Sequence, residues 1–334
     1  MNVWWLLPAV FLVSWALTFA LMRYASAKRL MDIPNERSSH SVPTPRGGGV
    51  AIVGSFLFAL LVTASQDLVS SSTFYGLLFS GLLITILGFV DDHGHVAAKW
   101  RLLGHFVAAG WALYWCNGLP PQQLAGVMVD LGWYGNVLAL IYLVWLLNLY
   151  NFMDGIDGLA STEAITVCMG MCLVYYLSGA VDLIWLPLLL SVAASGFLCW
   201  NFPPARIFMG DAGSGFLGII LGVLSLQAAW SKPELIFSWI ILLGVFIVDA
   251  TWTLGRRLLR GENIYQAHSS HAYQIAARRV GHKRVTLTVL SINLLVLLPV
   301  AILVATGALN TVTGVLLTFT PLGYLAYRLG AGKA

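Results

Sequence analysis

Long apolar runs, separated by short polar segments, form the main pattern along this chain. A helix that crosses a bilayer needs about 20 mostly apolar residues. Eleven segments come close to this length: 3–22, 48–65, 74–90, 102–116, 134–150, 162–178, 183–200, 214–230, 235–254, 285–305 and 311–328. The first has no basic region before it and no small-residue cleavage site, so we expect a retained helix and not a signal peptide. The pattern predicts an all-α polytopic membrane protein, with residues 1–334 as a single domain.

The composition strengthens this prediction. Hydrophobic residues make up 59% of the 334 residues and charged residues only 10%, whereas soluble domains carry about 25% charged residues. Lipid is therefore expected to be the main solvent of the chain. The four cysteines lie in apolar runs and form no CxxC pair, so the sequence predicts neither a zinc site nor a redox site.

The basic residues predict an orientation. If the N-terminus lies outside and the eleven segments alternate, Lys232 is the exception among 18 Lys and Arg residues, and the others fall in cytoplasmic loops or in the C-terminal tail. Cytoplasmic loops of membrane proteins are enriched in Lys and Arg. The sequence therefore predicts a periplasmic N-terminus and a cytoplasmic C-terminus. Topology also accounts for the net charge of +4, so we expect no nucleic-acid partner.

Five polar clusters interrupt the apolar pattern, and all of them lie on the predicted cytoplasmic side. They are HSVPTPRGGG (40–49), DDHGHVAAKWR (91–101), NLYNFMDGIDGLAS (148–161), NFPPARIFMGDAGS (201–214) and AHSSHAYQ (267–274). A transporter would carry polar groups near mid-membrane, often on broken helices. Clusters at the ends of spans can be reached from water, which favours an enzyme that acts at the inner surface.

The clusters combine acids with bases and glycine-rich turns. The acids are Asp91, Asp92, Asp154, Asp157 and Asp211, and the bases are Arg46, Lys99 and Arg101. Mg²⁺ takes one or two protein carboxylates and fills its other positions with phosphate oxygens and water. Glycines let the backbone approach an anionic ligand closely. We therefore expect a metal-bound phosphate opposite Asp91 and Asp92, with both side chains facing that site instead of capping a helix.

At these clusters the sequence resembles the polyprenyl-phosphate N-acetylhexosamine-1-phosphate transferases of glycosyltransferase family 4. HSVPTPRGGG is similar to the HxxPxPRxGG loop of that family, and DDHGHVAAKWR is similar to its DD motif. NLYNFMDGIDGLA resembles NxxNxxDGxDGLA, and NFPPARIFMGDAGS resembles an N…PAxxFMGDxGS stretch. The resemblance extends from about residue 20 to residue 275, with the motifs in the family's order, and implies a single transferase domain.

The resemblance implies a reaction and a set of site residues. A UDP-N-acetylhexosamine would donate a sugar 1-phosphate to undecaprenyl phosphate and release UMP. Asp211, helped by Asn151, would bind Mg²⁺, with Mn²⁺ as an alternative ion. Asp91 and Asp92 would serve the acceptor phosphate, one of them as general base. The further implied residues are Lys99 and Arg101 on phosphate, Asn148, Asp154 and Asp157 in a uridine pocket, Phe208 stacked on uracil, Arg46 and Asn201 as substrate ligands, and His268 and His271 as catalytic groups.

The fifth cluster departs from the family's pattern. Much of the family reads HxHH there, whereas this chain keeps His268 and His271 but has Ser270 in place of the middle His. The contiguous His run of the peptidoglycan translocases is absent. This difference favours the branch that starts O-antigen or related surface glycans, some of whose members use UDP-FucNAc or UDP-QuiNAc. We therefore expect a multi-pass protein of the bacterial inner membrane, and a homodimer is compatible with the resemblance.

Other interpretations stay open. The runner-up within the family is the phospho-MurNAc-pentapeptide translocase. A prenyltransferase would also use acids and Mg²⁺, but NFMDGIDGLA would have no role in it, and a CDP-alcohol transferase would need an Arg that DGIDGLAS lacks. A non-catalytic lipid-sugar transporter would release no UMP. Asp249 is either a buried structural acid or a functional one, and His105 and His282 are expected to be structural.

Overall fold

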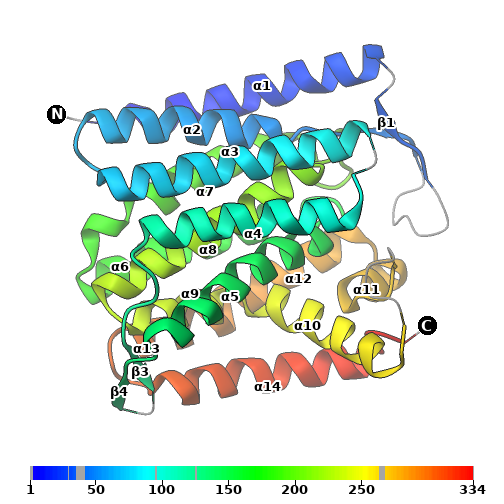
Figure 1. The fold of residues 1–334 in the computed structure, drawn as a ribbon. Coiled ribbons are helices and arrows are strands. Elements are labelled where there is room, and N and C mark those ends of the chain that lie inside the picture. The colour runs from blue at the N-terminus through cyan, green and yellow to red at the C-terminus, as the bar shows by residue number, and fades with distance from the viewer. Residues whose placement is uncertain are drawn as a thin grey trace.

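The computed structural model describes residues 3–28, 30–34, 42–94, 96–124, 126–262 and 268–333. Most of its long helices lie side by side with roughly parallel axes (Figure 1). The helices are α1 (Leu6–Lys28), α2 (Val50–Ser65), α3 (Ser71–His93), α4 (Ala98–Trp115), α5 (Gly132–Met153), α6 (Leu159–Ser178), α7 (Trp185–Asn201), α8 (Asp211–Ser231), α9 (Glu234–Leu242), α10 (Gly244–Leu259), α11 (Ala272–Val280), α12 (His282–Ile292), α13 (Leu298–Ala305) and α14 (Thr311–Leu329). A 3-10 turn (Val181–Leu183) precedes α7, and a π-helical segment (Asn293–Leu297) joins α12 to α13.

The all-α membrane architecture agrees with the apolar pattern, and each of the eleven predicted segments falls largely on helix. Among the described residues, seven helical segments are long and apolar enough to cross a membrane, or eight if the bent pair α9 and α10 is one span. The protein is therefore a multi-pass membrane protein. Eleven crossings stay a prediction, because α2, for example, has only 16 residues.

Residues 235–254, predicted as one apolar segment, do not form one continuous helix. The chain breaks at Leu243, between α9 and α10, and bends there by 71°. Gly244 follows the break, and a Cβ at this position would lie 3.3 Å from the Leu322 side chain of α14. Kinks in helices commonly occur where glycine removes the side chain and allows such an approach. The bend gives α10, which carries Asp249, its own direction in the bundle (Figure 1).

Helix α8 forms the centre of the bundle, and every residue from Ala212 to Ala229 except Gln227 is buried. Small residues let its neighbours approach closely. A Cβ on Gly218 would lie 2.7 Å from Leu147 Cα in α5, and a Cβ on Gly88 of α3 would lie 2.5 Å from the backbone nitrogen of Ala212. Both distances are too short for a side chain, so glycine is required at each contact. The last turn of α3 is thereby held against the first turn of α8.

Two short antiparallel hairpins lie at opposite ends of the bundle (Figure 1). One pairs β1 (Met31–Asp32) with β2 (Thr44–Pro45), and the other pairs β3 (Gln122–Leu124) with β4 (Val127–Val129). The N-terminal and C-terminal ends of the chain also lie at opposite ends of the bundle (Figure 1). The C-terminal end lies at the β1–β2 end, where α3 finishes and α8 begins. Which end faces the cytoplasm stays a prediction from the basic residues.

Candidate active site

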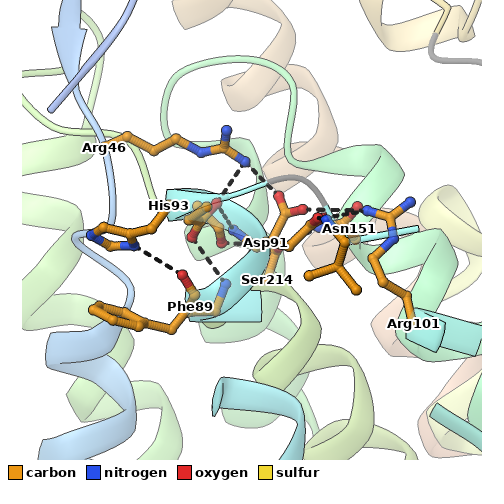
Figure 2. A network of polar contacts seen from close by, with 12 residues as sticks. Arg46, Phe89, Asp91, His93, Arg101, Asn151 and Ser214 are labelled. Carbon is orange, nitrogen blue, oxygen red and sulfur yellow. Dashed lines mark hydrogen bonds and ion pairs between the residues drawn. The ribbon is translucent and has the colours of Figure 1, made fainter. Parts of the chain in front are cut away.

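Three aspartates from two helices meet where α3 ends and α8 begins (Figure 2). Arg46 Nη2 lies 2.7 Å from Oδ1 of Asp92 and 2.7 Å from Oδ1 of Asp211. Arg101 Nη1 lies 2.5 Å from Oδ2 of Asp91 and 3.8 Å from Oδ2 of Asp211. The two guanidinium groups thus approach the carboxylates from different sides (Figure 2). Five of the predicted site residues therefore form one charged cluster.

Asp92 has a structural role that the sequence analysis did not anticipate. Its Oδ1 accepts a hydrogen bond of 3.1 Å from the backbone nitrogen of Asp211, and its Oδ2 accepts one of 3.4 Å from that of Ala212. These are the first two residues of α8, whose unpaired N–H groups favour a negative charge. Gly210, with a φ of 79°, precedes them, and a Cβ there would lie 2.7 Å from Asp92 Oδ2. The expectation that neither aspartate caps a helix is therefore wrong for Asp92.

Asp91 lies in different surroundings. Its Oδ1 accepts a hydrogen bond of 2.9 Å from the backbone nitrogen of Val96, in the turn before α4. Unlike Asp92, Asp91 lines a cavity of about 540 Å³, which we call the apolar cavity. The two adjacent aspartates thus separate into one that caps α8 and one that faces a cavity.

The apolar cavity runs between α3, α4, α5, α8 and α10. Its apolar walls include Ile84, Leu87, Leu102, Phe106, Ile141, Val144, Trp145 and Leu254, and its polar end is formed by Asp91, Arg101, Asn148, Asn151, Asp211, His268 and His271. Long apolar walls with a charged end suit a ligand that has a hydrocarbon chain and an anionic head. Arg101 Nε, buried at this end, has no hydrogen-bond acceptor in the described part of the chain. An anionic oxygen would satisfy it.

A second cavity, of about 210 Å³, lies on the other side of Asp211, and we call it the polar cavity. Its lining includes Asp32, Arg46, Asn151, Asp154, Asp157, Asn201, Phe208, Asp211, Gln274 and His282. Asn151 and Asp211 line both cavities. A ligand in one cavity and a ligand in the other would therefore meet at these two side chains.

Several predicted residues of the polar cavity also shape the cavity wall. Asn201 Oδ1 accepts from the backbone nitrogen of Gly158 at 3.0 Å, and its Nδ2 donates to the Ile207 carbonyl at 2.9 Å. Asp157 Oδ2 accepts from the backbone nitrogen of Ala205 at 3.0 Å. These bonds tie the DGIDG turn to the segment before α8. Asn201 is consequently a positioning residue, since its amide is already engaged.

Asp154 faces the polar cavity from the C-terminal end of α5. Removal from water and the nearby Asp211 carboxylate raise the pKa of the Asp154 carboxyl well above its usual range, and Arg46 acts in the opposite direction. Asp154 is therefore one of the polar groups that a ligand in this cavity would meet.

Two predicted residues lie elsewhere. Asn148 lines the apolar cavity and not the polar one, and its Nδ2 lies 3.2 Å from His105 Nδ1. It is thus separated from Asp154 and Asp157, with which we had grouped it. Lys99 lines neither cavity, and its Nζ lies 5.6 Å from the centre of the Trp100 ring. The two His residues of the fifth cluster do reach the site, where their rings stack with centres 4.8 Å apart.

Three residues to which the sequence analysis gave no site role contribute to this region: Asp249, which it left open, His282, which it expected to be structural, and Gln274. Asp249 of α10 accepts hydrogen bonds of 2.9 Å from the backbone nitrogens of Ala272 and Tyr273, so it caps α11. His282 Nδ1 lies 3.2 Å from Asp157 Oδ1, and Gln274 lines the polar cavity. Asp249 and His282 stand outside the five polar clusters, and Gln274 is the last residue of the fifth, but the role of each depends on a tertiary contact that no local pattern predicts. His95 and the first two residues of the HSVPTPRGGG cluster (40–41) lie outside the described residues.

The donor set around Asp211 fits a magnesium ion that shares its ligands with a phosphate. Within the described ranges, no group of three or more His, Cys, Asp or Glu side chains is arranged to hold a metal. Mg²⁺ does not need one, since it is commonly bound by one or two carboxylates plus substrate phosphates. Asp211 supplies a carboxylate, and Asn151, whose Nδ2 donates to Ser214 Oγ at 2.9 Å, retains its carbonyl oxygen. These two side chains would hold the ion.

Comparison with known proteins agrees with this geometry. A family model described as glycosyl transferase family 4 matches residues 74–229. A protein of Bacillus subtilis (strain 168), named a probable undecaprenyl-phosphate N-acetylglucosaminyl 1-phosphate transferase, is 30% identical over 267 residues, which are 78% of this chain and 73% of that protein. The chain belongs to glycosyl transferase family 4. It is an enzyme of the sugar-phosphate transferase type.

Other members of the family carry two kinds of name. The decaprenyl-phosphate N-acetylglucosaminephosphotransferase of Mycobacterium leprae (strain TN) is 30% identical over 89% of this chain and 79% of that protein. A phospho-N-acetylmuramoyl-pentapeptide-transferase of Ruegeria sp. (strain TM1040) is also 30% identical, over 68% of this chain and 70% of its own length. Identity alone therefore does not separate the two kinds of enzyme.

Proposed function

We propose that the protein transfers an N-acetylhexosamine 1-phosphate from a UDP-sugar to undecaprenyl phosphate and releases UMP. An oxygen of the acceptor phosphate attacks the β-phosphorus of the donor. The bond between that phosphorus and the bridging oxygen breaks, and UMP leaves with the electron pair. The product is a sugar joined to the lipid through a diphosphate.

The meeting of the two cavities at Asp211 supports this reaction most directly. The apolar cavity can take the polyprenyl chain and presents the acceptor phosphate to Asp91 and Arg101. The polar cavity can take the nucleoside, with Asp154 and Phe208 in its lining. The donor diphosphate would then lie beside Asn151 and Asp211, which both cavities share. Holding two reactants in this geometry makes an otherwise bimolecular step effectively unimolecular.

Each charged side chain has a defined task in this proposal. Asp91 is the general base for the acceptor phosphate, because it faces the apolar cavity whereas Asp92 is engaged at the start of α8. Arg46 and Arg101 neutralise phosphate oxygens, and Arg101 Nε has no acceptor in the described chain until one is bound. His268 and His271 line the apolar cavity near the acceptor. Mg²⁺ bound by Asp211 and Asn151 would stabilise the charge that develops on phosphate oxygens.

The choice of donor is the finer part of the proposal. We infer an enzyme that starts O-antigen or related surface glycans, because Ser270 replaces the middle His of the HxHH pattern. The Ser270 hydroxyl lies 3.0 Å from His268 Nδ1. Candidate donors include UDP-FucNAc and UDP-QuiNAc besides UDP-GlcNAc. The alternative donor is UDP-MurNAc-pentapeptide, which fits the name of the Ruegeria relative.

One assay tests the reaction and the donor together. Purified protein receives undecaprenyl phosphate, Mg²⁺ and one member of a panel of UDP-sugars that includes UDP-MurNAc-pentapeptide. We expect release of UMP, and not UDP, together with a lipid-linked sugar diphosphate from one of the N-acetylhexosamine donors. A product only with the pentapeptide donor would assign the protein to peptidoglycan synthesis. Absence of UMP with every donor would favour the transporter interpretation. Assays with EDTA, and then with Mg²⁺ or Mn²⁺ restored, test the metal requirement.

The orientation and the location in a bacterial inner membrane can be tested in cells. Cysteines replace Ser71 and Ser231 at one end of the bundle and Ser270 at the other. An impermeant thiol reagent should label the first two positions from outside and leave Ser270→Cys unlabelled until the cells are opened. External labelling of Ser270→Cys would reverse the predicted orientation.

A further inference from the structure

A third cavity, of about 330 Å³, lies at the end of the bundle opposite the carboxylate cluster, and we call it the distal cavity. It lies between the C-terminal part of α8 and the connections from α2 to α3, α4 to β3 and α6 to α7. Four aromatic side chains contribute to its wall: Trp115, Tyr175, Trp185 and Trp230. Ligand cavities in proteins commonly have volumes of about 300–1,000 Å³. The distal cavity therefore has room for a small ligand only.

Several polar side chains of the wall have unused hydrogen-bonding capacity. In the described chain, the side chains of Asn117, Asp182 and Gln227 make no hydrogen bond or ion pair, and all three line the cavity. Gln227 is half-buried, whereas Asn117 and Asp182 are exposed. The Nε1 of Trp115 is buried and lacks an acceptor among the described residues. An amide offers two donors and an acceptor, and a carboxylate offers acceptors only. A ligand with several hydroxyl groups could satisfy all of these atoms at once.

The aromatic belt of membrane proteins accounts for only part of this arrangement. Belt residues place their polar atoms at the headgroup level, and Trp230, which is 51% exposed, can be one of them. Trp115 Nε1, in contrast, is enclosed by protein, and Tyr175 is only 1% exposed. An anionic ligand is also disfavoured, because among the described residues no Lys, Arg or His lines the cavity, whereas Asp182 does. The chemistry that remains is that of a neutral ligand with an apolar face and polar edges.

We propose that the distal cavity binds a neutral pyranose. The C–H face of a sugar ring is apolar and packs against aromatic rings, while its hydroxyl groups radiate toward amides and carboxylates at the edge. The ligand is either a free monosaccharide or the terminal unit of a glycan. This site is separate from the proposed donor site, since the two cavities share no residue. The protein thus binds a sugar at both ends of the bundle.

Binding is tested with the full chain in lipid nanodiscs, because many detergents carry a sugar head. Glucose, N-acetylglucosamine and an N-acetylglucosamine trisaccharide are titrated, with saturation-transfer NMR of the sugar and tryptophan fluorescence as readouts. We expect saturable binding of at least one sugar, with a dissociation constant on the order of 1 mM for so small a polar ligand. Tighter binding of the trisaccharide than of both monosaccharides would identify a glycan as the ligand. Equal affinities would identify the free sugar.

Variants locate the binding. Gln227→Leu removes the amide at nearly constant volume and should weaken binding about tenfold or more, the effect of losing about one good hydrogen-bonded contact. Trp133→Ala is the matched control, since Trp133 lies at the same end, is 64% exposed and does not line the cavity. Saturable binding that Gln227→Leu leaves unchanged, or that excess UDP displaces, would overturn the proposal. So would the absence of saturable binding with all three sugars. UMP release by the same samples reports separately on the proposed transferase reaction.

Discussion

Two helices at the active-site end, α8 and α11, both begin at the carboxylate of an aspartate from another helix. Asp92 accepts hydrogen bonds of 3.1 and 3.4 Å from the first residues of α8, and Asp249 accepts two of 2.9 Å from the first residues of α11. Both side chains are nearly inaccessible, with exposures of 5% and 7%. In both places a carboxylate stabilises the start of a helix by accepting hydrogen bonds from its unpaired N–H groups.

The surroundings of the two caps differ. Asp92 is also bound by Arg46, and the helix that it caps begins with Asp211, which faces both cavities. Asp249 has no Arg or Lys partner among the described residues; it contacts the Thr253 hydroxyl at 3.1 Å and His271 Nδ1 at 3.4 Å. One cap is therefore part of the charged centre, whereas the other holds a segment that lines it. Mutations at these positions should therefore distinguish the loss of a reacting group from the displacement of a segment that lines the site.

The largest effect is expected from Asp211→Asn. If Asp211 binds the ion, the variant loses charge stabilisation worth several kcal/mol, which corresponds to a fall in rate of about 10³-fold or more. UMP release measures this fall. Glu234→Gln, at the far end of the bundle in the first turn of α9, is the matched control and should keep its rate. A rate for Asp211→Asn close to that of the control would remove Asp211 from the metal site.

The adjacent pair should give the next largest effect and should not behave as equals. Asp91→Asn removes the proposed base, which typically costs about 10²–10⁴ in rate, and it should leave the melting temperature nearly unchanged. Its rate should recover partly at higher pH, as more acceptor phosphate loses its proton unaided. Asp92→Asn should lower both the rate and the melting temperature, since a lost helix cap costs about 1 kcal/mol. A pH recovery in Asp92→Asn alone would exchange the two roles.

Asp249→Asn should have a smaller effect on the reaction. Asn can accept one backbone N–H but carries no charge, so α11 is held less firmly. Tyr273 of α11 donates to the Phe152 carbonyl at 2.9 Å, and a Cβ on Gly155 would lie 2.1 Å from the Tyr273 hydroxyl. The shift should therefore reach the DGIDG turn and raise KM for the UDP-sugar several-fold more than it lowers kcat. A fall in kcat as large as that of Asp91→Asn would instead make Asp249 part of the reacting centre.

The sequence predicted which residues form the charged cluster, but it did not predict the hydrogen bonds that hold them in place. Asp91, Asp92, Asp211, Arg46 and Arg101 stand next to turns in recognisable motifs, so their common end of the bundle follows from counting spans. The two caps could not be predicted, because Asp92 and Asp211 are 119 positions apart and no local period links them. The bend at Leu243 was missed since an apolar run looks the same whether the helix is straight or broken. Asn148 was grouped with Asp154 because both belong to the NLYNFMDGIDGLAS cluster. In the structure Asn148 lies within α5 and Asp154 follows the end of this helix, and the two side chains line different cavities.

The smallest predicted effect is on the pH dependence of stability, and it comes from His268, which lies just before α11, the helix that Asp249 caps. Burial, followed by the neighbouring His271, lowers the pKa of His268 from 6.5 to about 4. The folded protein therefore binds fewer protons at this site than the unfolded chain between pH 6.5 and 4. The contribution of His268 is fully present above pH 6.5, and stability is lost as the pH falls through this window.

Replacement of this imidazole should isolate its contribution. Neutral His268 can accept a hydrogen bond at Nδ1 from the Ser270 hydroxyl, 3.0 Å away, and protonation at Nδ1 would remove this acceptor. We expect the melting temperature of the wild type to fall between pH 6.5 and 4 more steeply than that of His268→Gln, which has no titrating group. Near pH 7.5 the two proteins should differ little. Identical slopes would mean that His268 titrates normally in the folded protein, and that the segment capped by Asp249 is open to water.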